Sequence, residues 1–313
     1  MEYRKLGQTD LTVSRIAFGT IPFKLREYSV EQGAELLVAA AEQGINFFDL
    51  AEIYGTYPHA REALRQINQP IIVASKSMAK TADEMEDSIK KALDETGLDR
   101  IDIFKLHGVD SLEDLEARKP AWEALLKAKS DGLVRVVGVS THSCKVLEEI
   151  ADWPEVEVVL AILNQGLRGV LEGSMAESHQ GIKRAHVAGK GVYLMKVFAG
   201  GNLFASARQA LEFALDLPEV DSVAVGMQNV EEVIFNSAVA SGVEVPPDIQ
   251  RALDTCVRQL HIRPFCKACG TCVDECRYGA LTMGEKMPIV DEEKCILCGY
   301  CGFACPAMAI KIL

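Results

Sequence analysis

The distribution of cysteines constrains the fold of this chain more than any other feature of its sequence. Ten cysteines are present among 313 residues, and eight of them lie between residues 266 and 313. The first 257 residues contain only Cys144 and Cys256, each of which we interpret as a small apolar packing residue. Clustered thiols in a chain without a visible signal peptide indicate metal or redox chemistry rather than disulfides. We therefore expect one domain over residues 1–257 and a second, cysteine-rich domain over residues 258–313.

The eight clustered cysteines form two copies of one spacing. Cys266-x2-Cys269-x2-Cys272-x3-Cys276 is followed, after 18 residues, by Cys295-x2-Cys298-x2-Cys301-x3-Cys305. Two such runs resemble the bacterial-type ferredoxins that hold two 4Fe-4S clusters, in which the fourth cysteine of each run binds the other cluster. Zinc is the alternative, but structural zinc sites favour two cysteine pairs separated by a longer gap. The resemblance implies one cluster on Cys266, Cys269, Cys272 and Cys305, and another on Cys295, Cys298, Cys301 and Cys276.

Residues 16 to 240 alternate apolar runs of strand length with segments of helical periodicity that end near a glycine. The apolar runs are rich in Ile and Val, as is typical of strands buried on both faces. They are Ile16–Gly19, Asn46–Leu50, Ile71–Ser75, Ile101–Leu106, Val134–Val139, Val156–Leu163, Gly191–Val197 and Ser222–Val225. Eight such units predict an α/β fold, a (β/α)8 TIM barrel, followed by a small α+β ferredoxin-like domain. A doubly wound sheet is the alternative, but no GxGxxG follows the first run.

Four polar side chains lie where successive strands of the predicted barrel end, which is where the active sites of such barrels lie. Asp49 and Tyr54 follow the second strand, Lys76 ends the third, and His107 ends the fourth. Each alone is typical of a helix cap or a solvated charge, but their convergence indicates chemistry. A Lys⁺ beside the tyrosine would lower the pKa of the phenol, the aspartate would keep the lysine charged, and a neutral histidine would orient a carbonyl. This set suits protonation of a carbonyl oxygen.

Residues 47–55 (FFDLAEIYG), together with Lys76, His107 and residues 138–140 (GVS), resemble the aldo-keto reductase superfamily over about residues 1 to 240. Residues 3–14 resemble the hairpin that closes the barrel bottom in its bacterial branches. The resemblance implies a (β/α)8 barrel and NADPH-dependent reduction of aldehydes or ketones. It makes Tyr54 the proton donor, Lys76 its activator, Asp49 the partner of the lysine and His107 the residue that orients the substrate.

The nicotinamide contacts that the resemblance implies match the family less well. Thr141 replaces the usual Asn after Ser140, Leu160 stands where a Gln is expected, and Met195 stands where a tyrosine stacks on the nicotinamide. Glu232 replaces a basic residue near the adenosine ribose and would repel a 2′-phosphate, so we expect NADH to bind at least as well as NADPH. The implied cofactor-binding set is Gly19, Thr20, Asp49, Ser140, Thr141, Met195, Lys196, Gly226, Met227, Gln228, Glu232 and Asn236.

Composition narrows the possible partners and location of the protein. The net charge of −12 argues against nucleic acid or an anionic membrane as a partner. No apolar run reaches the length that spans a bilayer, and no signal peptide is visible, so we expect a cytoplasmic protein.

The two parts together predict an oxidoreductase that interconverts a small carbonyl and alcohol with NAD(P)H. Electron transfer through two 4Fe-4S clusters would couple to this reaction or regulate it, with a redox protein docking on the ferredoxin-like domain. Two alternatives stay open. In one, the barrel no longer uses nicotinamide and electrons from the clusters reduce the substrate directly. In the other, the chain is an electron-transfer subunit whose barrel is only a scaffold.

Overall fold

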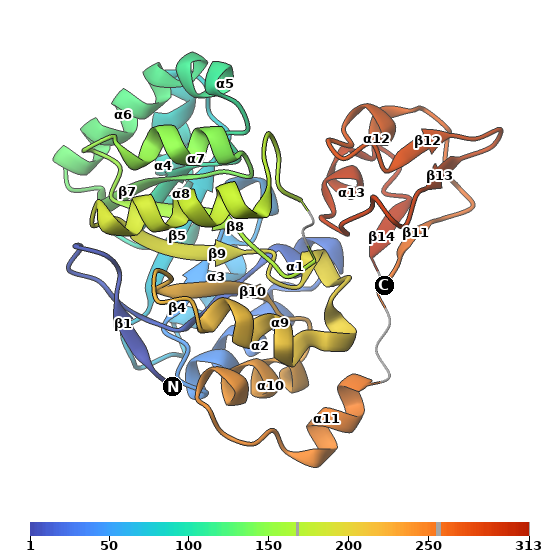
Figure 1. Cartoon of the computed structure of the whole chain (residues 1–313), viewed down its shortest axis with the longest axis horizontal. Coiled ribbons are helices and arrows are strands. Elements are labelled where there is room, and N and C mark those ends of the chain that lie inside the picture. The colour runs from blue at the N-terminus through green and yellow to red at the C-terminus, as the bar shows by residue number, and fades with distance from the viewer. Residues whose placement is uncertain (167–168, 255–257, 313) are drawn as a thin grey trace.

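The computed structural model describes residues 1–166, 169–254 and 258–312, whose elements are shown in Figure 1. Within these residues eight parallel strands close a barrel in the order β10-β3-β4-β5-β6-β7-β8-β9. Their bounds are β3 Ile16–Gly19, β4 Phe47–Asp49, β5 Ile72–Ser77, β6 Ile101–Leu106, β7 Val134–Ser140, β8 Val158–Ile162, β9 Gly191–Met195 and β10 Ser222–Gly226. Each strand overlaps one of the eight predicted apolar runs, and β5, β7 and β10 extend one or two residues beyond theirs, so the predicted (β/α)8 barrel is confirmed.

Helices cover the outside of the barrel and follow its strands along the chain (Figure 1). Three of them, α2 (Val30–Glu42), α4 (Ala82–Thr96) and α8 (Met175–Val187), begin with capping boxes. In each, the side chain of the cap residue (Ser29, Thr81 or Ser174) accepts from the backbone N–H of the third helical residue, whose side chain accepts from the cap N–H in return. The helices of this part are α1 Ile21–Leu25, α2 Val30–Glu42, α3 Tyr57–Leu64, α4 Ala82–Thr96, α5 Leu112–Ala117, α6 Lys119–Ser130, α7 Cys144–Ala151, α8 Met175–Val187, α9 Ala207–Leu215, α10 Val230–Ala240 and α11 Pro247–Asp254. None of the helices in the described ranges is long and apolar enough to cross a membrane.

An antiparallel hairpin of β1 (Tyr3–Lys5) and β2 (Thr12–Ser14) covers the end of the barrel where its strands begin. Leu6, Leu11 and Val13 of this hairpin are buried against side chains inside the barrel, including Phe47 and Tyr193. The hairpin and the interior side chains form one apolar cluster, which excludes water from the lower barrel. The opposite end, where the strands finish, is left for polar side chains.

The cysteine-rich region forms two small antiparallel pairs, β11 (Leu260–Ile262) with β14 (Ile310–Ile312), and β12 (Leu281–Met283) with β13 (Pro288–Val290). Two short helices, α12 (Thr271–Asp274) and α13 (Tyr300–Ala304), follow the two cysteine loops.

The two cysteine loops repeat one backbone conformation. Ala268 and Gly270 in the first loop have φ of 49° and 81°, and Leu297 and Gly299 in the second have φ of 52° and 83°. The two runs of the sequence thus fold as two copies of one unit, as the repeated spacing predicts.

The cysteine-rich region packs against the end of the barrel where the strands finish. Gly200 lies so close to it that an added Cβ would be 1.5 Å from the carbonyl oxygen of Ile296, and its φ is 72°. The Tyr278 hydroxyl donates to the Gly169 carbonyl over 3.2 Å, and the Asn202 side chain donates to the Cys295 carbonyl over 3.0 Å. The barrel and the second cysteine loop therefore meet at backbone-to-backbone distance.

We predict that a chain ending at residue 257 still folds as a barrel, because β3 to β10 and their helices all precede that point and β11 pairs with β14. It should be soluble and unfold cooperatively when followed by far-UV circular dichroism. A chain ending at residue 219 is the matched control, since it lacks β10 and should fail to fold. A wholly insoluble 1–257 chain would contradict this domain boundary.

Candidate active site

A buried carboxylate forms the centre of the polar side chains at the barrel mouth. Asp49, at the end of β4, accepts from Lys76 Nζ at 2.5 Å and from Lys105 Nζ at 3.2 Å. The Tyr193 hydroxyl donates to the same carboxylate over 2.8 Å, and Lys76 also donates to the Leu50 carbonyl over 2.9 Å. The two lysines come from β5 and β6, so adjacent strands direct two cations at one anion. At least one of the two positive charges is left unneutralised.

Burial and mutual attraction set the charge of these groups. Burial alone would raise the pKa of Asp49, but the charges of Lys76 and Lys105 outweigh it and hold that pKa below its usual value. Burial lowers the pKa of Lys76, which the Asp49 charge counteracts. Burial, with a smaller contribution from the nearby Lys76, lowers the pKa of Lys105 to about 8 against the pull of Asp49. The site therefore carries a net positive charge at neutral pH.

Lys105 is a member of this site that we did not infer from the sequence. Its side chain is completely buried, and its Nζ lies 5.1 Å from the centre of the Tyr193 ring. The signal was present in the sequence, because a lysine interrupts the apolar run Ile101–Leu106 two residues before His107. A charged residue inside such a run needs a buried partner, and Asp49 is that partner.

Tyr54 and His107 face each other beside the charged group. Tyr54 ends a 3-10 turn, Glu52–Tyr54, and its ring meets the His107 ring edge-on with centroids 5.7 Å apart. Lys76 Nζ lies 5.0 Å from the centre of the Tyr54 ring. Burial lowers the pKa of His107 well below its usual value, so the imidazole is neutral as expected. Asp49, Tyr54, Lys76 and His107 thus come together, as the sequence predicts.

The expected lowering of the Tyr54 pKa is wrong for this arrangement. Burial, followed by the influence of Tyr300 and Asp49, raises the pKa of Tyr54 well above its usual value. The Tyr54 side chain is buried because the Phe303 ring stacks on it, with ring centroids 6.2 Å apart and planes 11° from parallel. The sequence identified the lysine beside the phenol but not the aromatic side chain above it.

The cysteine-rich region contributes a second phenol to this site. The hydroxyl of Tyr300, in α13, lies 3.4 Å from His107 Nε2. Burial raises the pKa of Tyr300 to about 12, and Tyr300 is in turn one of the groups that raise the pKa of Tyr54. Tyr300 lies between the cysteines of the second run, so the sequence analysis placed it in the other domain. The barrel mouth is therefore built from both parts of the chain.

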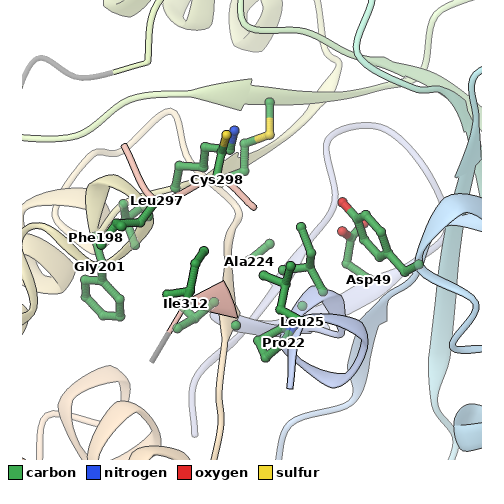
Figure 2. Close-up of a pocket in the computed structure, with 18 of the residues that line it drawn as sticks. Pro22, Leu25, Asp49, Phe198, Gly201, Ala224, Leu297, Cys298 and Ile312 are labelled. Atoms are coloured by element: carbon green, nitrogen blue, oxygen red, sulfur yellow. The ribbon is translucent and has the colours of Figure 1, made fainter. Parts of the chain in front are cut away.

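A cavity of about 140 Å³ lies between the barrel and the cysteine-rich region. Asp49, Tyr54, Lys76 and His107 all line it, as does Cys298 from the second cysteine run. Figure 2 shows Leu297, Cys298 and Ile312 on one side of the cavity, with Pro22, Leu25 and Ala224 of the barrel near them. The cavity is smaller than the roughly 300–1,000 Å³ of many ligand sites, which suits a small molecule.

The cysteines group as the two-cluster pattern requires. Cys276, Cys295, Cys298 and Cys301 line one cavity. In the other group, the Cys272 thiol has Cys305, Cys266 and Cys269 as its electrostatic neighbours.

Backbone N–H groups also reach the cysteine sulfurs. Ala280 donates to Cys276 and Ala309 donates to Cys305, each over 3.3 Å. Among the described residues no three His, Cys, Asp or Glu side chains are placed to hold a single metal ion. Four thiols around one cavity, with backbone donors to the sulfurs, fit the ligands of a 4Fe-4S cluster.

Comparisons with known proteins agree with this geometry. The Aldo/keto reductase family model matches residues 15–209, and the 4Fe-4S binding domain model matches residues 288–311. The chain belongs to the aldo-keto reductase family.

Its relatives include L-galactose dehydrogenase of Arabidopsis thaliana, which is 25% identical in an alignment of length 287 that covers 78% of this chain and 89% of that protein. The uncharacterized oxidoreductase YqkF of Bacillus subtilis is 27% identical in an alignment of length 164 that covers 48% of this chain and 52% of that protein. The chain thus spans about half the length of YqkF. A solved aldo-keto reductase of Pseudomonas aeruginosa shares the fold with a TM-score of 0.67 and 24% identity, covering 77% of this chain and 94% of that one.

The predicted nicotinamide contacts of this aldo-keto reductase are only partly gathered at the cavity. Of the predicted set, Gly19, Asp49, Met195, Lys196, Gly226 and Gln228 line it. Thr20, Ser140, Thr141, Met227, Glu232 and Asn236 are not among its lining residues in the described part of the chain.

The expected carboxamide-binding hydroxyls contact backbone groups instead. Ser140 Oγ accepts from the Gly108 N–H over 2.9 Å, and Thr141 Oγ1 accepts from the Ser143 N–H over 2.9 Å. Leu160 and Met195 present apolar surface where an amide and a ring would contact the nicotinamide. The cavity thus gathers six of the twelve nicotinamide contacts that the resemblance implies.

The environment of Glu232 differs from the one expected. The sequence analysis treated Glu232 as a carboxylate that would repel a 2′-phosphate, but Arg258 donates to this carboxylate over 2.6 Å, with both side chains largely buried. Arg258 lies beyond the barrel, just before β11, so no local pattern joined the two residues. The pair is neutral as a unit and offers no net positive charge to a 2′-phosphate.

We predict that Lys105→Met raises the melting temperature at pH 7, because it removes a buried positive charge and leaves Asp49 paired with Lys76. The folded protein releases the Lys105 proton near pH 8 and the unfolded chain near pH 10.5. Between these values the unfolded chain binds more protons, so the wild-type protein gains stability as the pH rises.

The amount by which Lys105→Met melts above the wild-type protein should therefore decrease between pH 8 and about pH 10, when melting is followed by circular dichroism. Exposed Lys127→Met is the control and should show no such pH-dependent difference. A Lys105→Met protein that melts lower than wild type at pH 7 would contradict an unneutralised charge at this position.

Proposed function

We propose that this aldo-keto reductase interconverts a small carbonyl and its alcohol, with a 4Fe-4S cluster beside the barrel site as its electron carrier. One observation carries the proposal: Cys298 lines the same cavity as Asp49, Tyr54, Lys76 and His107. The cluster on Cys276, Cys295, Cys298 and Cys301 would thus border the substrate. A second cluster, on Cys266, Cys269, Cys272 and Cys305, would lie nearer the surface, where Cys269 is exposed and a redox protein could deliver electrons.

The barrel side chains supply charge and a proton to the substrate. A carbonyl gains two electrons and two protons when it becomes an alcohol. The 4Fe-4S clusters, when bound, supply electrons singly, so negative charge builds on the substrate oxygen. The surplus positive charge of Lys76, Lys105 and Asp49 stabilises that oxygen, and burial strengthens the effect.

Two side chains would act at the substrate oxygen, and the second proton, which goes to the carbonyl carbon, would come from water. Tyr54, kept protonated by its raised pKa, holds the proton for the oxygen. Neutral His107, whose Nε2 lies near the Tyr300 hydroxyl, orients the carbonyl.

NAD(P)H-linked carbonyl reduction is the second candidate function, and the family favours it. The specific observation behind it is that the cavity runs past Gly19, Gly226 and Gln228, which the resemblance assigns to the dinucleotide. The misplaced Ser140 and Thr141 hydroxyls and the apolar Leu160 and Met195 favour the first candidate instead. We therefore derive no step through nicotinamide.

We predict that Tyr54→Phe lowers carbonyl turnover by roughly 10²–10⁴-fold, the usual contribution of general acid catalysis. The substitution removes the phenol and leaves the ring that stacks on Phe303. Lys76→Met should act similarly, and the double variant should lose no more than the stronger single one, since the residues act as a unit.

Tyr57→Phe is the matched control, because this buried phenol bonds Ser75 and lies outside the cavity lining. Turnover is measured with a substrate found in a screen of aldehydes and ketones. Cluster reduction by an external one-electron donor should be the same in all variants. Full turnover by Tyr54→Phe would show that the tetrad is not used.

The experiment that separates the two candidates is an anaerobic titration of the intact protein with a one-electron donor, NADH and NADPH. The protein should carry about eight iron and eight sulfide per chain, from its two ligand sets. We expect the one-electron donor to bleach the clusters and the carbonyl to restore their absorbance.

Oxidation of NADH or NADPH that accompanies reduction of the carbonyl, while the cluster absorbance stays constant, would establish NAD(P)H-linked reduction, the second candidate. NADH should then bind no more weakly than NADPH, since the Glu232–Arg258 pair is neutral. Stoichiometric zinc without sulfide would refute the cluster assignment and, with it, the first candidate function.

A further inference from the structure

Lys196 carries a buried ammonium group that has no hydrogen-bond partner in the described part of the chain. It follows β9 directly, with a left-handed φ of 56° that is unusual outside glycine. The other two cations that line the cavity are paired, Lys76 with Asp49 and Arg258 with Glu232. Lys196 is thus the cation of this cavity for which the described residues provide no anion.

The surroundings of this ammonium belong to the cysteine-rich region. Lys196 Nζ lies 5.4 Å from the centre of the Tyr300 ring and 6.0 Å from that of Tyr278. Tyr300 stands between Cys298 and Cys301 in the sequence, and Lys196 and Cys298 line the same cavity. Burial lowers the pKa of Lys196, and the nearby Cys298 sulfur counteracts this only in part. A barrel residue therefore directs its charge at a cluster ligand.

A buried ammonium without a counter-charge is costly, so such a group indicates an anion that completes the site. A 4Fe-4S cluster with four thiolate ligands is that anion: it carries net negative charge, and one unit more when reduced. A nearby positive charge stabilises the reduced form more than the oxidised form. Net charge around the cluster is one of the factors that set its reduction potential.

We propose that Lys196 is the counter-charge of the cluster on Cys276, Cys295, Cys298 and Cys301, and raises its reduction potential above that of the second cluster. The inference rests on the ligand assignment in the proposed function, and not on the barrel chemistry. In the part of the chain that the structure describes, no buried ammonium without a hydrogen-bond partner lies beside the second cluster: Cys269 is exposed, and the neighbouring Lys267 is exposed to water, which screens its charge. Electrons entering at the surface would therefore rest on the cluster beside the cavity.

The test is an anaerobic redox titration of the full-length protein, with each cluster followed by electron paramagnetic resonance. In Lys196→Met, we expect the higher of the two reduction potentials to fall by at least 59 mV, which corresponds to a tenfold change in the one-electron reduction equilibrium. The lower potential should change little. Lys196→Arg keeps the charge and should keep the wild-type values.

Lys294→Met is the matched control, because this lysine precedes Cys295 in the sequence but is exposed and paired with Asp291 at 2.9 Å. Removal of the Lys294 charge should leave both reduction potentials unchanged. If Lys196→Met does not fold, Lys196→Gln, which keeps a polar side chain of similar length, serves the same comparison.

Two results would overturn the inference. One is a Lys196→Met protein that has full iron and sulfide content and the same two reduction potentials as the wild-type protein. The other is an unchanged potential with weaker binding of anionic carbonyl substrates, which would make Lys196 a substrate-binding residue. Absence of iron and sulfide from the wild-type protein would instead refute the cluster assignment, so failure of the ligand assignment is told apart from failure of the Lys196 inference.

Discussion

The Asp49 carboxylate allows two lysines to lie inside the mouth of the barrel, and the site depends on it. An ammonium moved from water into a protein interior loses several kcal/mol of hydration, which a close carboxylate with additional hydrogen bonds can offset. Asp49 offers one oxygen to Lys76 and the other to Lys105 and Tyr193. The surplus charge that results is held on strands rather than loops, so it is oriented before any substrate enters.

The cysteine-rich region changes what this charged group can do. By placing Phe303 on Tyr54 and Tyr300 beside His107, it excludes water and strengthens every electrostatic interaction beneath it. It also puts a cluster ligand on the wall of a cavity that otherwise contains acid–base groups. In the proposed function, chemistry that moves electron pairs and cofactors that move single electrons would share one small space. This shared cavity distinguishes the arrangement from a barrel that merely has a ferredoxin joined to it.

Much of the fold and of the candidate site could be predicted from local sequence patterns. Most of the features that could not be predicted have a common physical origin. Strands buried on both faces are nearly continuous in apolar residues, so all eight were found, although β8 is shorter than its apolar run. The cysteine spacing and the four strand-end residues are likewise local signals. Tyr300, Arg258 and the raised pKa of Tyr54 depend on how two distant parts of the chain dock, which no periodicity encodes. Lys105 is different, because its place in an apolar run already indicated a buried charge.

The contact of Gly200 with the Ile296 carbonyl lies in the loop that runs from Cys295 to Cys298. The loop that would hold the proposed cluster is therefore also a wall of the cavity. If this loop takes its shape only when the cluster is bound, cluster insertion would have to precede completion of the barrel site. A cell short of iron would make a chain with a folded barrel but an unfinished active site, so iron supply would act as a checkpoint on the activity itself.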